Sequence, residues 1–429
     1  MVVGNESTTF QQFTLAPGLD LYVAPTQKFK RTRVSLFVHD RLDPDRVALG
    51  ALLPYVQKRG TRSHPTGKAL ERAAGALYDA QLSGGVFKFG DRQTLAYSLD
   101  LVSDRYVDEP VFQRGIQLLR EMVLEPAREN GGFVAAYVDQ EKRFQIGRVK
   151  ALVNDKIRYA NFRCIEEMFK GQPFAQYELG TEEAIQQVTP PKLWEHHQEL
   201  LATRPIDIYV VGDVDPHKVR DEIAEAFVTS RGDVLALEPT EVSLGEGPER
   251  TVIQEEPMNQ GWLVLGLRTD IRRSDPLRYG LQFFNGILGG FVHSKLFINV
   301  REKASLAYSA FSSYNANKGV ILAYAGIDVN KYEQALEIIK KQIDDTRAGR
   351  FSEEEFEATL KGFETQYRMR LDTPDGRIYH HLGGRLEGCP ESIDESLAKV
   401  AQVTRDDVIE AAQRVRLDTV YFLKGVSDR

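Results

Sequence analysis

Two side chains in the second half of the sequence have the types and the spacing to share one chemical task. Arg301 and Tyr308 stand seven residues apart (308 − 301 = 7). A guanidinium at the end of a helix and a phenol just beyond it can converge on one carbonyl or carboxylate, because both groups donate hydrogen bonds and arginine is always charged. The plainer interpretation is an arginine on the surface and a tyrosine in the core. Spacing alone leaves both interpretations open.

The segment that would position this pair begins as an apolar run near residue 284. The run breaks at two glycines, at 289–290, and resumes as an amphipathic helix. The residues that share one face of this helix, at the spacing of a buried stripe, are Leu296, Val300 and Ala304. Residues 307–309 then indicate a turn into a strand. The pair would therefore lie where a helix ends and a strand begins.

Residues 289–308 follow the pattern G-G-x-x-x-S-x-L-F-x-x-x-R-E-K-x-x-L-A-Y. This pattern resembles the C-terminal signature of the pitrilysin/insulinase family of zinc peptidases, to which the mitochondrial processing peptidase subunits also belong. In that family an arginine and a tyrosine at this spacing reach the active site from the half without metal, bind the substrate peptide and help to polarise its scissile carbonyl. The resemblance implies this substrate-binding role for Arg301 and Tyr308.

The same resemblance implies where a zinc motif should lie in the first half. Active members carry H-x-x-E-H on a helix that is followed by Gly-Thr; the two histidines bind zinc and the glutamate activates water. Residues 50–70 keep this frame, with Gly-Thr at 60–61. However, Ala51, Pro54 and Tyr55 occupy the positions of the His, Glu and His in that order.

A further zinc ligand in the family is a glutamate on a downstream helix, seven residues after another glutamate. Glu141 matches the first of these, so the ligand position falls on Arg148 (141 + 7 = 148). Alanine cannot bind a metal, proline cannot act as a base, tyrosine is a poor zinc ligand and arginine repels a dication. The sequence therefore predicts no metal and no cofactor in this chain, and no peptidase activity when the chain is alone.

Other histidines offer weaker candidates. His196, His197 and Glu199 come nearest to a metal motif, but no third ligand lies close in the sequence, so a solvated helix face is predicted instead. His380 and His381 precede Leu-Gly-Gly, which indicates a helix end or a turn. The sequence contains no serine or cysteine nucleophile motif.

Composition excludes several classes of protein. The chain has 429 residues, the length of two or three ordinary domains, and a net charge of −7, which disfavours nucleic acid as a partner. No apolar run approaches the roughly 18 residues of a membrane span, and the first residues show no signal peptide. Cys164 and Cys389 are far apart, which favours free buried thiols in the cytoplasm.

A repeat organises the whole chain. The phrase around Thr189 recurs around Thr404, 215 residues later (404 − 189 = 215), and each predicts a capped helix that leads into a strand, at 206–211 and at 419–423. In the first half, alternating residues predict two strands within 13–40, and Thr66 would cap a helix.

The repeat indicates an α+β protein built from two homologous domains, each a mixed sheet covered by helices, that arose by internal duplication. Residues 1–229 would form the N-terminal domain with the degenerate zinc motif. Residues 230–250 combine glutamate, proline and glycine with little periodicity and would form a linker. Residues 251–429 would form the C-terminal domain with the Arg/Tyr pair.

Three functions remain open. In the first, the chain is a zinc-less subunit of a two-chain peptidase: a related, zinc-bearing partner carries H-x-x-E-H, and this chain supplies Arg301, Tyr308 and half of the chamber, so proteolysis needs both. The second is a peptide-binding or scaffold protein, alone or as a homodimer, without proteolytic role. The third is a different enzyme on the same fold, for which no catalytic constellation appears. A neighbouring gene with an intact H-x-x-E-H would favour the first.

Overall fold

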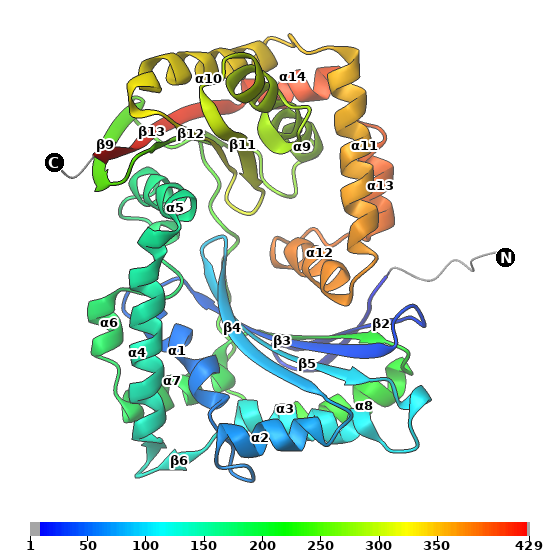
Figure 1. Ribbon diagram of the computed structural model, residues 1–429. Coiled ribbons are helices and arrows are strands. Elements are labelled where there is room, and N and C mark those ends of the chain that lie inside the picture. Colours follow the sequence, from blue (N-terminus) through cyan, green and yellow to red (C-terminus); the bar gives the residue numbers. More distant parts are fainter. Residues whose placement is uncertain (1–8, 427–429) are drawn as a thin grey trace. The chain divides into compact units, whose positions relative to one another are not determined.

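A computed structural model describes residues 9–426 of the chain (Figure 1). These residues form two compact units. The first holds the described residues up to Lys150, Gln176–Glu238 and Thr373–Tyr379. The second holds Ala151–Ala175, Pro239–Asp372 and the described residues from His380 onward. None of the helices within residues 9–426 combines the length and the apolar character that crossing a membrane requires.

The first unit is built on a six-stranded mixed sheet in the order β1-β2-β8-β3-β5-β4. Only the β2–β8 pair is parallel. The strands are β1 (Gln11–Ala16), β2 (Leu19–Pro25), β3 (Arg31–Arg41), β4 (Gln81–Phe89), β5 (Arg92–Val102) and β8 (Ile206–Gly212). The N-terminal region thus has one strand more than the two expected, because a turn at Gly18, with φ of 63°, folds β1 back onto β2.

Helices cover one face of this sheet (Figure 1). The helices of this unit before residue 238 are α1 (Val47–Gln57), α2 (Gly67–Gly75), α3 (Val111–Leu124), α4 (Ala135–Ala151), α6 (Glu182–Gln186), α7 (Pro190–Thr203) and α8 (Pro216–Phe227), with a small hairpin of β6 (Arg128–Glu129) and β7 (Gly132–Phe133); α1, α2, α3, α7 and α8 pack on the strands. Thr66 caps α2 by accepting a hydrogen bond from the Ala69 amide, as predicted. The core between sheet and helices includes Leu36, Leu99 and Leu119, each no more than 1% exposed.

The second unit is built on a five-stranded mixed sheet in the order β11-β12-β10-β13-β9. The strands are β9 (Arg250–Pro257), β10 (Gly261–Thr269), β11 (Ala307–Asn315), β12 (Val320–Ile327) and β13 (Val415–Val426). Its helices are α5 (Lys156–Met168), α9 (Arg278–Asn285), α10 (Tyr332–Arg347), α11 (Glu353–Arg370), α13 (Ile393–Val400) and α14 (Arg405–Gln413), with two π-helical segments, η4 (Gly286–Gly290) and η5 (Phe297–Lys303).

The two sheets share one topology, which confirms the predicted duplication. The spatial series β2-β8-β3-β5-β4 of the first unit corresponds to β9-β13-β10-β12-β11 of the second, and the single parallel pair lies at the same place in both. β8 and β13, predicted from the repeat, occupy equivalent positions. Thr189 and Thr404 cap the equivalent helices α7 and α14. The fold is therefore α+β with two homologous halves; among the strands of the two large sheets within residues 9–426, β1 alone lacks a counterpart.

Helix α5 lies in the first half of the sequence but in the second unit. Its residues Cys164 and Met168 pack on Val264 and Tyr421, which point away from the helices on the opposite face of that sheet. The side-chain-free Gly266 permits this close approach, since a Cβ there would lie 3.0 Å from the Cys164 sulfur. Both cysteines are free; Cys164 is buried, and Cys389 only partly.

The start of helix α12 (Pro374–Leu386) shows the reciprocal arrangement, because it belongs to the first unit. The ring of Tyr379 lies 5.8 Å from the rings of both Phe37 on β3 and Phe87 on β4. Asp375 accepts hydrogen bonds from Arg33 at 3.0 and 3.2 Å. The compact units therefore differ from the predicted domains 1–229 and 251–429 in two segments. Residues 151–175 belong to the second unit, and residues 373–379 belong to the first. The boundary at Glu238/Pro239 falls within a stretch, 228–249, that forms neither helix nor strand.

Candidate functional site

The positions that align with the zinc motif lie on one helix. Ala51, Pro54 and Tyr55 all belong to α1. Ala51 is fully buried at 0% exposure. Pro54 stands inside the helix and packs on β4, since a Cβ at Gly84 would lie 3.0 Å from both the Pro54 Cβ and its carbonyl oxygen. An alanine and a proline at these places supply no ligand and no base.

The fourth aligned position meets the third in space. Arg148 lies on α4, with its guanidinium carbon 4.1 Å from the ring centroid of Tyr55. The same guanidinium lies 4.0 Å from the carboxylate of Glu141, which is buried and also accepts a hydrogen bond from Arg59 Nε at 2.6 Å. A cation–π stack and an ion-pair network therefore occupy the place where the alignment expects metal ligands.

This arrangement does not fit a zinc ion. Zinc sites need three or four nitrogen, sulfur or carboxylate ligands around one point. Within residues 9–426 no group of three or more His, Cys, Asp or Glu side chains could hold a metal ion. Among residues 9–426, Glu141 forms ion pairs with the guanidiniums of Arg59 and Arg148, so its carboxylate is already paired with positive charge. No catalytic step through a metal follows from these residues.

Arg301 lies on the π-helical segment η5, not on the α-helix that was predicted. The buried side chains of Leu296 and Val300 anchor this segment to the core. The guanidinium carbon of Arg301 lies 4.5 Å from the ring centroid of Phe297 and its Nε lies 3.7 Å from the Glu302 carboxylate. The side chain is nevertheless 41% exposed. π-helical turns are rare in proteins, and those that occur are often found at functional sites.

Tyr308 is the second residue of β11 and is 70% exposed. A left-handed turn at Ser305, with φ of 50°, leads the chain from η5 into this strand. The interpretation of Tyr308 as a core residue is therefore wrong. The structure places Arg301 and Tyr308 on consecutive elements of the second unit, with both side chains accessible to a ligand.

His196 and His197 are buried, at 4% and 2% exposure, so the predicted solvated helix face was wrong. His197 Nε2 donates a hydrogen bond to the Val123 carbonyl at 2.8 Å, and burial lowers its pKa to about 4. Burial and the charge of Arg46 lower the pKa of His196 to about 3. Both rings are thus neutral core groups of α7. The sequence could not reveal this, because Arg46 lies 150 residues away along the chain.

His380 and His381 lie inside α12, so the predicted helix end or turn was wrong there as well. His380 borders a cavity of the second unit that no sequence motif indicated. The arginines around this cavity come from separate elements and share no spacing. Only their charge, next to an unusually arginine-rich stretch at 268–278, could have drawn attention to them.

Comparisons with known proteins agree with this geometry. The family described as "Peptidase M16 inactive domain" matches residues 187–363. A curated relative from Bacillus subtilis, "Probable inactive metalloprotease YmfF", is 38% identical over 413 residues, which cover 95% of this chain and 96% of the relative.

Two solved structures extend the likeness over the whole fold. A conserved protein from Enterococcus faecalis matches with a TM-score of 0.90 and 28% identity, over 98% of this chain and 100% of that one. A peptidase M16 inactive domain from Pseudomonas fluorescens matches with a TM-score of 0.79 and 16% identity, over 98% of this chain and 99% of that one, and shows the fold alone.

Proposed function

This chain belongs to the M16 peptidase family, the pitrilysin/insulinase-type peptidases, as a non-catalytic member without the zinc motif, and from that premise we propose that it is one subunit of a two-chain peptidase. A related partner carries the zinc. This chain contributes Arg301, Tyr308 and half of the chamber, and the complex cleaves peptides that neither chain cleaves alone.

The observation that carries the proposal is a contrast between the two halves. In the first half, the Arg148–Tyr55 stack fills the place of the metal. In the second half, Arg301 and Tyr308 remain accessible, and the π-helical segment holds Arg301 on the ring of Phe297. A guanidinium and a phenol that are already oriented before the reaction can stabilise the negative charge that develops on a scissile carbonyl.

The proposal is tested by co-expression. The chain is produced with a zinc-bearing M16 chain encoded in the same genome, preferably by the adjacent gene, and the mixture is analysed by size-exclusion chromatography and by hydrolysis of a quenched fluorescent peptide library. We expect a stable complex with activity that both purified chains lack. Full activity of the zinc-bearing chain by itself, with no complex, would refute the proposal.

That refuting result would favour the second hypothesis, a peptide-binding or scaffold protein without proteolytic role. Sedimentation analysis of the purified chain would then show whether it forms a homodimer.

For either function we propose a location in the cytoplasm, because both cysteines are free thiols.

A further inference from the structure

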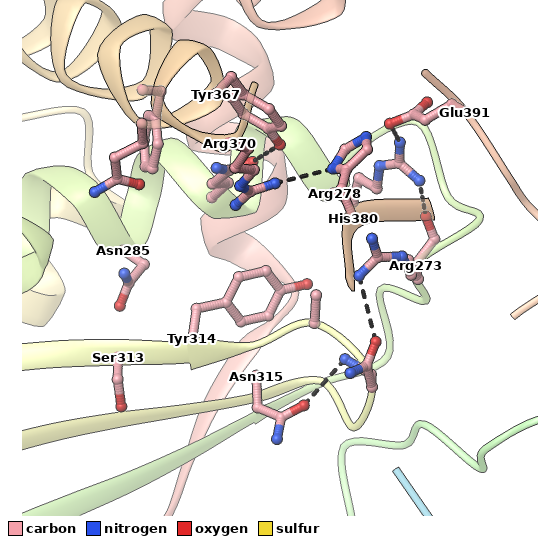
Figure 2. Close-up of a pocket in the computed structure, with 15 residues that line it drawn as sticks. Arg273, Arg278, Asn285, Ser313, Tyr314, Asn315, Tyr367, Arg370, His380 and Glu391 are labelled. Atoms are coloured by element: carbon pink, nitrogen blue, oxygen red, sulfur yellow. Dashed lines mark hydrogen bonds and ion pairs between the residues drawn. The ribbon is translucent and has the colours of Figure 1, made fainter. Parts of the chain in front are cut away.

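The second unit contains a cavity of about 580 Å³ that lies apart from Arg301 and Tyr308. Helices α9 and α11, the β11–β12 turn and the second part of α12 surround it (Figure 2). The charged residues that line it are Arg273, Arg278, Arg370 and Glu391. Three guanidiniums thus share one cavity with a single carboxylate.

The carboxylate of Glu391 already accepts hydrogen bonds from several neighbouring side chains. It accepts hydrogen bonds from Arg278, Tyr279 Oη, Ser396 Oγ at 2.7 Å and Lys399 Nζ at 2.7 Å. Burial opposes its ionisation, but these donors outweigh burial and lower the pKa of Glu391 to about 2. Glu391 therefore balances Arg278 and Lys399 and leaves no negative charge for the other two arginines.

Arg273 and Arg370 contact neutral groups. Arg273 Nη1 donates to the Asn317 side-chain oxygen at 3.3 Å, and its buried Nε has no hydrogen-bond partner in the described structure. Arg370 Nη1 donates to His380 Nδ1 at 3.0 Å and its guanidinium stacks on Tyr367 at 4.4 Å. Burial and the charge of Arg370 lower the pKa of His380 to about 4, so this ring is neutral at pH 7.

A third donor faces the same cavity. The hydroxyl of Tyr314, on β11, is buried and has no hydrogen-bond partner among residues 9–426 (Figure 2). Burial raises the pKa of Tyr314, which keeps the hydroxyl protonated. Buried donors without a partner and uncompensated charges are costly, and a bound ion or ligand is one of the ways in which native proteins satisfy them.

The duplication gives the cavity a counterpart in the first unit. Helices α9 and α11 and strand β11 correspond to α1, α4 and β4. In the first unit, Arg148 of α4 stacks on the ring of Tyr55 of α1. In the second unit, Tyr367 of α11 donates a hydrogen bond to Gln282 of α9 at 3.1 Å beside an open space. The equivalent helices are therefore linked by different side-chain contacts in the two copies, and in the second copy these contacts border a cavity.

We propose that this cavity binds an oxyanion, the carboxylate or phosphate group of a small ligand, between Arg273 and Arg370 with the Tyr314 hydroxyl as a third donor. Guanidiniums match the planar carboxylate and the phosphate group with paired hydrogen bonds. An anion would offset the surplus of positive charge and satisfy both orphaned donors. The site lies wholly within the second unit and does not depend on the proposed function.

Calorimetric titration of the full chain tests the site with three probes. These are inorganic phosphate, N-acetyl-trialanine with a free C-terminal carboxylate, and the same peptide as its C-terminal amide. We expect binding of phosphate or of the free-acid peptide, weakened by added salt, and no binding of the amide. Phosphate alone would identify a phosphate ligand, and the free-acid peptide alone a carboxylate. No binding of any probe at millimolar concentration would overturn the proposal.

Arg273→Gln, Arg370→Gln and Tyr314→Phe provide the variants. Removal of either guanidinium should weaken binding about tenfold or more, as expected for a charged hydrogen bond. The exposed neighbours Arg272 and Arg368 supply matched controls on the same segments, and Arg272→Gln and Arg368→Gln should leave binding unchanged. Melting temperatures identify any variant that fails to fold, and Tyr314→Phe, which keeps the ring, remains informative in that case. Equal affinity in variants and controls would overturn the proposal.

Discussion

The guanidinium of Arg148 lies over the ring of Tyr55, 4.1 Å from its centroid. Both residues stand at positions where the sequence resemblance to active members of the family implies zinc ligands. The stack joins α1 to α4, as a shared metal ion would, but it does so with a cation and an aromatic face. The contact between the two helices has therefore been kept while the metal chemistry has been lost.

We predict that the purified chain contains no stoichiometric zinc and cleaves no peptide by itself. The reason is that none of Ala51, Pro54, Tyr55 and Arg148 is a competent zinc ligand or general base in this setting. Elemental analysis of the chain, purified without chelator, checks the metal content. About one zinc per chain, removed by chelator together with activity, would contradict the prediction.

Arg148→Met should lower the free energy of unfolding by about 1 kcal/mol, because it removes the cation–π contact with Tyr55 and part of the charge that balances Glu141. Urea denaturation followed by circular dichroism measures the change. Arg143→Met, at an exposed position of the same helix, is the control and should change stability little. Equal effects of both variants would mean that the stack contributes nothing.

In the proposed two-chain complex, Arg301→Ala or Tyr308→Phe should reduce kcat about a hundredfold if the pair binds the developing oxyanion, since loss of one such donor typically costs about 2.7–4 kcal/mol in the transition state. Folding and assembly should survive, because Tyr308 is largely exposed and Arg301 is partly exposed. Steady-state kinetics and melting temperatures are measured together. Tyr106→Phe, at another exposed tyrosine, is the control. Turnover that stays at the wild-type level in both variants would exclude a catalytic contribution of the pair.

Gly266→Ala should destabilise the second unit by about 1–3 kcal/mol, because the new methyl group must displace the sulfur atoms of Cys164 and Met168 on α5. Gly147→Ala is a control for which we expect a change of stability of the opposite sign. Nothing lies within 4 Å of a Cβ at that exposed position in α4, so a gain of about 0.5–1 kcal/mol is expected from helix propensity. Thermal denaturation of both variants checks the two signs. A neutral Gly266→Ala would show that α5 is loosely packed.

The stability of the first unit should fall as the pH drops from about 6.5 to about 4. His197 has a lowered pKa of about 4 in the folded state, so the unfolded chain binds the extra proton across this window. This single group contributes on the order of 3 kcal/mol, which is present above pH 6.5 and lost toward pH 4. Denaturant titrations at several pH values should show a weaker pH dependence for His197→Gln. If the stability of His197→Gln depended on pH as strongly as that of the wild type, another group would be responsible for the proton uptake.

Local signals predicted the framework well. The Thr189 and Thr404 caps are short-range features, and the recurring phrase around them was enough to place β8 and β13 at equivalent positions. The resemblance to the zinc peptidase family, applied to residues 50–70 and to the position seven residues after Glu141, pointed to Tyr55 and Arg148, which the structure brings into contact. These features depend on helix geometry and capping, which sequence carries directly.

Long-range contacts were beyond such reasoning. His197 is neutral because it is buried, and the carbonyl that accepts its hydrogen bond belongs to Val123, 74 residues earlier. Arg273 and Arg370 share a cavity although almost a hundred residues separate them (370 − 273 = 97). The π-helical geometry around Arg301 also escaped prediction, because its apolar spacing is close to that of an α-helix.

Because each compact unit contains a segment from the other half of the sequence, a single cut in the linker does not separate the two units. A cut within residues 230–250 would leave α5 on one fragment and β10 with β13 on the other, so that Val264 and Tyr421 would lose their cover. The same cut would take Tyr379 from Phe37. Expression of either half of the sequence alone should therefore expose apolar side chains that the other half covers in the intact chain.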